Sequence, residues 1–143
     1  HGPRGGDEIN KIIFNKNYGW PIASYWEKYS SYNSKTYYKK NHHTYGFEEP
    51  IFAYVPSIGI SEIIKLPNEF SETFQNNFII TSLAHRHIHR IKFDKNFKKI
   101  IFDEKIFINE RIRDITYEKK YNLILMAFEE KGELGILSIV NEE

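Results

Sequence analysis

The sequence predicts an all-β fold built from short antiparallel strands. Aromatic residues make up 16% of the 143 residues and isoleucine is abundant, and both residue types favour strands. Short apolar runs recur over residues 51–140 and are separated by polar breaks such as "LPNEF", "DKNF" and "EEKGE". No stretch of about eleven residues or more repeats its apolar positions at the helical period. We therefore expect antiparallel meanders with hardly any helix.

The apolar runs divide into two sets, residues 51–102 and residues 111–140, with four strands expected in the first and three in the second. Each set has about the length of one β-propeller blade, for which repeats of roughly 40–50 residues are typical. A propeller closes with about four to eight blades, so about two blades would leave open sheet edges. Either the chain is part of a larger propeller or the blade interpretation is wrong. The runs are "IFAYV", "IGISEIIKL", "NNFIITSL", "RHIHRIKF", "KKIIF", "RIRDITY", "YNLILMAF" and "ELGILSIV".

The overall composition excludes several classes of protein. Lys plus Arg is 20 and Asp plus Glu is 19, which gives a net charge of +1 and no broad basic surface for nucleic acid. Cysteine is absent, so there is neither a disulfide framework nor a thiolate metal site. No apolar run approaches the roughly 18 residues of a membrane helix. The chain begins at His1 inside a Gly/Pro turn, and we expect further sequence upstream of it.

Two turn clusters near the start of the chain flank an acidic pair. "GPRGGDEIN" carries Asp7 and Glu8 after a Gly-Gly turn, and "NKNYGWP" carries Tyr18 in a second turn. Calcium prefers oxygen ligands and combines carboxylates with backbone carbonyls from turns. The segment is a candidate calcium site, although a solvated acidic turn is the preferred interpretation from local chemistry alone.

The motif "AHRHIHR" places His85, His87 and His89 at alternate positions. On a strand, the three imidazoles would project from one face and could hold zinc as in a hydrolase. However, His85 and His89 would lie roughly 13 Å apart at the strand rise, too far to share one ion without a bend. Solvent-facing histidines on an outer strand are therefore the preferred interpretation.

The motif "NERIRDI" places Arg111 and Arg113 on one face of a strand, with Asp114 on the other. Two neighbouring guanidiniums repel each other unless an anion or a carboxylate lies between them, and their planar donor forks suit carboxylates and phosphates. The apolar Ile112 and Ile115 indicate a partly buried strand. A bound anion and an edge strand lined with surface charge remain alternatives.

Residues 27–49 are polar and rich in tyrosine, and they are expected to form one long loop. Lys39, Lys40, His42 and His43 lie in this segment among tyrosines, an arrangement that could stack bases and contact phosphates. In a nearly neutral protein, a solvated loop is the preferred interpretation.

Taken together, these motifs resemble the C-terminal part of the soluble quinoprotein aldose (glucose/sorbosone) dehydrogenases, which carry pyrroloquinoline quinone (PQQ) on a six-bladed β-propeller. "GPRGGDEIN" followed by "NKNYGWP" is similar to the calcium-binding segment of that family, and "RIRDI" to its closing arginine motif. "EEPIFAYVPSIGISE" and "FIITSLAHRHIHRIKF" resemble the strands between them. The resemblance implies a single partial propeller domain over residues 1–143, with about two four-stranded antiparallel blades after a loop-rich N-terminal segment. Its parts are a calcium corner and long loop (1–50), a blade (51–102) and the last blade (111–140).

The resemblance also implies which residues bind calcium and cofactor. Gly2 and Pro3 would offer backbone carbonyls to a calcium that also binds the quinone. The Glu8 carboxylate and the Tyr18 carbonyl would hold a second, structural calcium. The cofactor-binding positions implied are Tyr29, the turn Ser82, Leu83 and Ala84, and the arginine motif Arg111, Ile112 and Arg113.

At Ala84 some relatives place a lysine, whose charge alanine does not replace; His85 and Arg86 are the neighbours that could compensate.

The function implied by the resemblance is oxidation of the CH–OH group of aldose sugars with PQQ and calcium, in the periplasm or outside the cell. In that family the catalytic base is a histidine in earlier blades, and none of the six histidines here occupies a matching position. We expect the base and the other blades upstream of His1, and no turnover from these 143 residues alone. The alternatives are a non-enzymatic β-propeller piece that acts as a binding module and a zinc hydrolase built on the three histidines.

Overall fold

The computed structural model describes residues 1–2, 4–25 and 38–140. Within them, helix is confined to two short 3-10 segments, η1 (His42–Tyr45) and η2 (Glu72–Phe74), so the expected scarcity of helix is confirmed. No helix in this part of the chain is long and apolar enough to cross a membrane. The strands are β1 (Asp7–Ile9), β2 (Phe52–Tyr54), β3 (Ile60–Lys65), β4 (Asn77–Ser82), β5 (His87–Phe93), β6 (Ile100–Phe107), β7 (Ile112–Glu118), β8 (Leu123–Phe128) and β9 (Leu134–Ser138).

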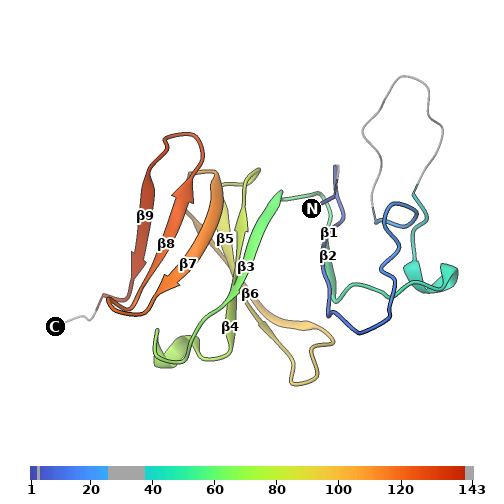
Figure 1. Ribbon diagram of the computed structural model, residues 1–143, viewed down its shortest axis with the longest axis horizontal. Helices are drawn as coiled ribbons and strands as arrows, with labels where there is room; N and C mark the ends of the chain where they lie inside the picture. The colour runs from blue at the N-terminus through green and yellow to red at the C-terminus, as the bar shows by residue number, and fades with distance from the viewer. Residues whose placement is uncertain (3, 26–37, 141–143) are drawn as a thin grey trace.

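The strands form three antiparallel sheets, in the orders β1-β2, β3-β4-β5-β6 and β7-β8-β9. Figure 1 shows the four-stranded sheet in the middle, with the three-stranded sheet on one side and β1-β2 on the other. The antiparallel meanders and the three strands within 111–140 are confirmed. The described part of the last set makes a three-stranded sheet, so four strands there are not formed.

The four-stranded sheet occupies residues 60–107, whereas the blade was expected over residues 51–102. The first apolar run gives β2, which pairs with β1 through the register Asp7↔Tyr54 instead of joining the sheet. Pro56 has no N–H to donate to a ladder and Gly59 has φ +66°, so the chain turns away between β2 and β3. At the other end, β6 continues through polar residues on the exposed edge of the sheet.

The central sheet is covered on both faces, which places a core on each side of it. Adjacent residues of β4 illustrate this: Ile79 belongs to the cluster facing the last sheet, and Ile80 to the cluster facing β1-β2. The first cluster comprises Leu66, Phe70, Ile79, Ile88, Ile112, Ile115, Ile124 and Met126. The second comprises Ile9, Tyr54, Ile58, Ile80, Ile91 and Phe93.

The segment expected to be a solvated loop is partly structured. Residues 26–37 lie outside the described residues, but η1 follows and its His42 is fully buried. Tyr38 is buried as well. The solvated-loop interpretation is therefore wrong for these two residues, because η1 folds His42 against the Glu8 carboxylate.

Candidate functional site

Asp7 fixes the start of the chain to the turn that leads into the central sheet. Its carboxylate is fully buried and accepts the Gly2 N–H at 2.7 Å and the Ser57 hydroxyl at 2.5 Å. It also accepts three consecutive backbone N–H groups, those of residues 58–60, at 2.7–3.1 Å. These bonds use the acceptor capacity of both oxygens. Asp7 therefore acts as a structural anchor for Gly2, and Glu8 is the member of the acidic pair left to bind an ion.

Gly2 lies where no larger residue fits. A Cβ atom built there would come within 2.1 Å of the Gly5 backbone oxygen. The glycine thus permits the tight path of the chain that Asp7 holds in place. Pro3, the other residue expected at the cofactor's calcium, lies outside the described residues, as does Tyr29.

Several expected cofactor residues converge on one hollow of about 280 Å³. Gly2 belongs to the N-terminal segment, and Leu83 and Ala84 belong to the turn after β4. Arg111 is the residue that directly precedes β7. The rest of the lining is His1, Arg4, Ser57 and Gly59. Segments that are far apart in the sequence therefore meet at one end of the sheets. Arg4 is a cation that the sequence interpretation did not single out.

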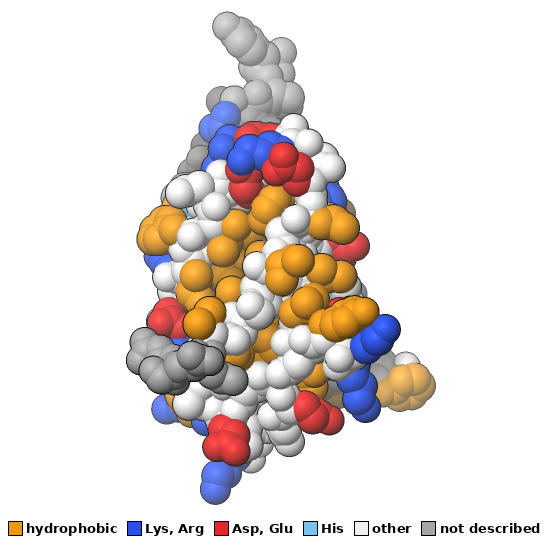
Figure 2. Space-filling model, turned by 90° about the vertical axis from the view of Figure 1, so that its left-hand side faces the viewer, with side chains coloured by type: hydrophobic (Ala, Val, Ile, Leu, Met, Phe, Trp, Pro, Cys, Tyr) orange, Lys and Arg blue, Asp and Glu red, His pale blue; other side chains and the backbone are white. Residues whose placement is uncertain are grey.

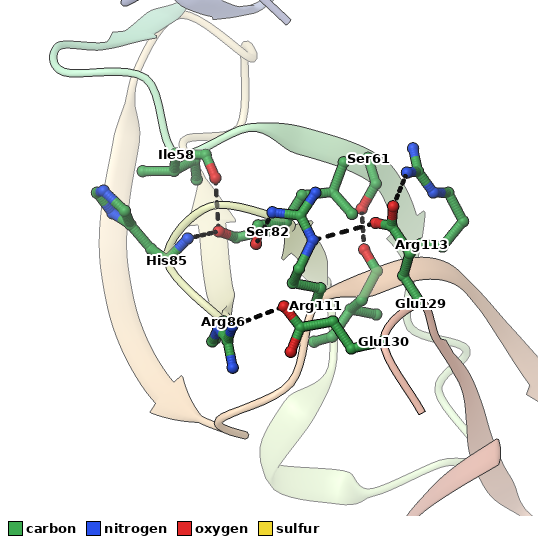
Figure 3. A network of polar contacts seen from close by, with 11 residues as sticks. Ile58, Ser61, Ser82, His85, Arg86, Arg111, Arg113, Glu129 and Glu130 are labelled. Atoms are coloured by element: carbon green, nitrogen blue, oxygen red, sulfur yellow. Dashed lines mark hydrogen bonds and ion pairs between the residues drawn. The ribbon is translucent and has the colours of Figure 1, made fainter. Parts of the chain in front are cut away.

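Ser82 does not line this hollow, but it shapes the turn that does. Its fully buried hydroxyl donates to the Ile58 carbonyl at 2.7 Å and accepts the His85 N–H at 3.0 Å (Figure 3). The hydroxyl thereby fixes the turn on which Leu83 and Ala84 line the hollow.

Arg111 and Arg113 share a carboxylate that belongs to the chain itself. Glu129 Oε2 lies 3.2 Å from Arg111 Nε, and Glu129 Oε1 lies 2.8 Å from Arg113 Nη2 (Figure 3). Arg111 also donates through Nη1 to the Leu83 carbonyl at 3.4 Å. The hydrogen bond from Arg113, together with Arg111, lowers the pKa of Glu129. In this structure the counter-charge between the arginines is a glutamate of the chain itself.

Glu129 was missed because only the strand register reveals it. Ile112 pairs with Phe128 across β7 and β8, and the Glu129 N–H donates to the Arg111 carbonyl at 2.9 Å. This pairing brings the start of the turn after β8 beside the arginines. Ile112 itself is fully buried in the core, so its side chain positions the motif by packing.

Neither residue expected to compensate for Ala84 lines the hollow. The Arg86 guanidinium pairs with Glu130 at 2.7 Å (Figure 3), and the His85 side chain lines a different hollow beside His89 and Asp103. Positive charge reaches the Ala84 hollow instead from Arg4 and Arg111.

A second hollow, of about 210 Å³, is lined by Glu8 of the expected calcium corner, whereas Tyr18 is not among its lining residues. Glu8 and Asn10 line it, together with residues of the N-terminal turns and of the 20–24 segment. Asn10 Nδ2 donates to Glu8 Oε2 at 3.3 Å, while the buried Asn10 Oδ1 has no hydrogen-bond partner. Burial raises the pKa of Glu8, and the Asn10 hydrogen bond and His42 partly offset that rise. An orphaned amide oxygen beside a carboxylate is a donor set that suits a calcium ion.

The Tyr18 side chain folds back onto residues 11–13 of the N-terminal segment. The Tyr18 hydroxyl donates to the Lys11 carbonyl at 2.8 Å and accepts the Ile13 N–H at 2.7 Å. Its backbone carbonyl is the group that the calcium prediction uses.

The expectation of solvent-facing histidines is wrong for His87 and His89, whereas His85 is exposed as expected. His87 and His89 are buried in β5, because β1-β2 covers this face of the central sheet, and His85 belongs to the preceding turn. Among the described residues, no three His, Asp or Glu side chains are arranged to hold a metal ion. The zinc-hydrolase alternative therefore has no support in this part of the chain.

Comparison with known proteins identifies the family. The sequence profile described as "Glucose / Sorbosone dehydrogenase" matches residues 1–136. The aldose sugar dehydrogenase YliI of Escherichia coli (strain K12) is 32% identical over 136 residues, covering 94% of this chain and 36% of that protein.

Two solved structures share the fold. A crystal structure of glucose dehydrogenase superposes with a TM-score of 0.81 at 26% identity, covering 99% of this chain and 40% of the other. The apo form of the soluble aldose sugar dehydrogenase of Escherichia coli gives 0.78 at 26% identity, covering 97% and 40%. The chain thus spans well under half the length of these relatives. The chain belongs to the glucose/sorbosone dehydrogenase family.

Proposed function

We propose that this chain forms part of a quinoprotein that oxidises the CH–OH group of aldose sugars with PQQ and calcium. The single observation that carries the proposal is the hollow where Gly2, Leu83, Ala84 and Arg111 meet. These positions come from three separate segments, and the family resemblance assigns all of them to the cofactor or its calcium. Arg4 adds a second cation to the lining, which suits a ligand that bears several carboxylates.

In this proposal the chain's own residues bind and orient the cofactor. Arg111 and Arg113 bind cofactor carboxylates with their planar donor forks. Gly2 brings a backbone carbonyl close to the hollow because Asp7 holds it there. Held by these residues, the quinone would supply the redox chemistry of the reaction and calcium would supply Lewis-acid chemistry. The catalytic base would come from blades outside these 143 residues.

Calcium fits a second place as well, at Glu8. The Glu8 carboxylate and the unpartnered Asn10 Oδ1 supply oxygen donors, to which the Tyr18 carbonyl would be added. An ion there would stabilise the N-terminal turns that carry Gly2.

The proposal includes further blades as partners within the same protein. The outer face of the β7-β8-β9 sheet is apolar: Leu134 is 71% and Ile136 is 64% exposed. Figure 2 shows hydrophobic side chains gathered on this side of the molecule. Such a face suits packing against another sheet, as blades do in a propeller. Six blades and a periplasmic or secreted location complete the proposal by analogy with the family.

A binding module without enzymatic activity is the second candidate. The observation that favours it is Glu129, which already supplies a counter-charge to both arginines without any ligand. In this alternative the arginine motif stabilises the turn after β8 and no cofactor binds.

Titration of the complete protein with PQQ in the presence of calcium distinguishes the sugar dehydrogenase from the binding module. Saturable quinone binding together with sugar-dependent reduction of a dye supports the dehydrogenase. Absence of quinone binding in a folded, calcium-loaded protein would contradict it and favour the module.

A further inference from the structure

Two buried histidines of β5 face each other through the same ring atom. His87 Nε2 lies 2.7 Å from His89 Nε2, and the ring centroids are 4.6 Å apart. Their exposed fractions are only 3% and 1%. The contact therefore lies away from bulk water, inside the interface between the central sheet and β1-β2.

The other ring nitrogen of each histidine must carry a hydrogen atom. His87 Nδ1 lies 3.0 Å from the His85 backbone carbonyl, which can only accept. His89 Nδ1 lies 2.6 Å from Asp103 Oδ1, and an ionised carboxylate likewise only accepts. Both Nδ1 atoms are thus donors, and these two acceptors fix the orientation of both rings.

This arrangement leaves the two Nε2 atoms without a proton if both rings are neutral. Two lone pairs would then face each other at 2.7 Å in a buried site, which is unfavourable, whereas one additional proton turns the contact into a charge-assisted hydrogen bond. A metal ion is the wrong size for the gap. Ligand nitrogens lie about 2.0–2.1 Å from zinc, so two of them on one tetrahedral ion would be roughly 3.3 Å apart.

We propose that His87 and His89 hold a single shared proton at neutral pH, as an imidazolium–imidazole pair whose charge is balanced by Asp103. The shared proton belongs to the folded chain itself and does not depend on a bound quinone or calcium. It assigns a proton-binding site to an interface between sheets.

Charged and titratable groups surround the pair from two strands and a turn. Asp103 and Lys105 come from β6, Tyr54 comes from β2, and His85 lies in the turn before β5. The Tyr54 ring lies 5.0 Å from the His89 ring, and burial, with Asp103 and Asp7, raises the pKa of the Tyr54 hydroxyl. Of these groups, only Asp103 contacts the pair with an opposite charge.

The pair takes up protons in two separate steps. The Asp103 carboxylate next to His89 Nδ1 and the facing Nε2 lone pair both favour the first proton. Burial lowers the pKa of His87, and positive charge on His89, His85 and Lys105 lowers it further. This effect opposes a second proton.

The second proton sets an acid limit for the interface. Because burial lowers the folded pKa of His87, the cost of that proton appears as pH falls below about 6.5. The packing of β2 against β5 is therefore expected to weaken on acidification.

Long-range hydrogen–nitrogen NMR spectra of the histidine side chains test the proposal on the unmodified chain. Between pH 4 and 10, we expect both Nδ1 atoms to report as protonated and the Nε2 atoms to share one proton over a wide range. Loss of that proton should occur in one step that both rings report together. An unprotonated Nδ1 in either ring, or two independent titrations near 6.5, would overturn the proposal. So would a zinc-induced shift of both Nε2 resonances.

Asp103→Asn is the matched variant, because an amide oxygen still accepts from His89 Nδ1 but the charge is gone. The upper step should move down by about 1–3 pH units. Glu104→Gln is the control, since Glu104 pairs with Arg90 on the other face of the sheet at 2.6 Å. An upper step that moves equally in both variants, or in neither, would contradict the assignment to Asp103.

Discussion

The Asp7 carboxylate accepts a hydrogen bond from the Gly2 backbone N–H at 2.7 Å. This contact joins the first residues of the chain to β1, and through residues 57–60 the same carboxylate joins them to β3. One acidic side chain thus positions a wall of the candidate cofactor hollow.

Asp7→Asn should destabilise the fold by about 3 kcal/mol or more. The amide would place donors against backbone N–H groups and would lose the charge that strengthens each bond, and hydrogen bonds to charged groups contribute about 1.5–3 kcal/mol each. Urea unfolding followed by fluorescence measures the loss. Asp94→Asn is the control, because Asp94 also accepts backbone N–H groups but lies in an exposed turn. Equal losses in the two variants would contradict the anchoring role.

Glu8→Gln should weaken calcium binding and loosen residues 2–21. The substitution keeps an oxygen near Asn10 but removes the ligand charge on which calcium affinity depends. The measurement is the rise in melting temperature on adding calcium, which should shrink in the variant. Glu48→Gln serves as the control, since Glu48 pairs with Lys16 at 2.6 Å outside this hollow. An unchanged rise in melting temperature with calcium in Glu8→Gln would contradict a calcium site at Glu8.

Glu129→Gln should strengthen quinone binding by up to about fivefold. Glu129 competes with cofactor carboxylates for both arginines, and exposed ion pairs are worth about 0–1 kcal/mol. The comparison is with Glu130→Gln, whose carboxylate pairs with Arg86 instead. Weaker binding in Glu129→Gln alone would show that the glutamate orients the arginines rather than competing for them.

Arg113→Ala should weaken quinone binding by about 1.5 kcal/mol, the lower end for a charged hydrogen bond, because the side chain is half exposed. Arg113→Lys should restore only part of the affinity, since an ammonium lacks the planar fork. Calorimetric titration of the complete protein measures both. Full recovery of the affinity in Arg113→Lys would show that only the positive charge matters, and would contradict a role for the planar guanidinium.

The strands were predictable because period and breaks are local properties of a sequence. The β7-β8-β9 meander is an example: three apolar runs lie between short polar turns, and each forms the expected strand. The departure of β2 from the central sheet was not predictable in this way. Its partner β1 has only three residues, and nothing local distinguishes "IFAYV" from a blade strand.

Burial of polar side chains was the other property that the sequence did not reveal. His87 and His89 look like a solvent face because histidine is polar and alternates along the strand. Their burial depends on β1-β2 covering this face of the central sheet, which is a long-range contact. Glu129 reaches the arginines for a similar reason, through the register of β7 and β8.

The central claim is that the hollow lined by Gly2, Ala84 and Arg111 binds the quinone. The most direct test is titration of the complete protein with PQQ at saturating calcium, comparing the wild type with Arg111→Ala. Loss of the charged contact should weaken binding by about 1.5–3 kcal/mol, which is roughly tenfold or more, while the unfolding midpoint changes little. Unchanged quinone affinity in a folded Arg111→Ala protein would contradict the account.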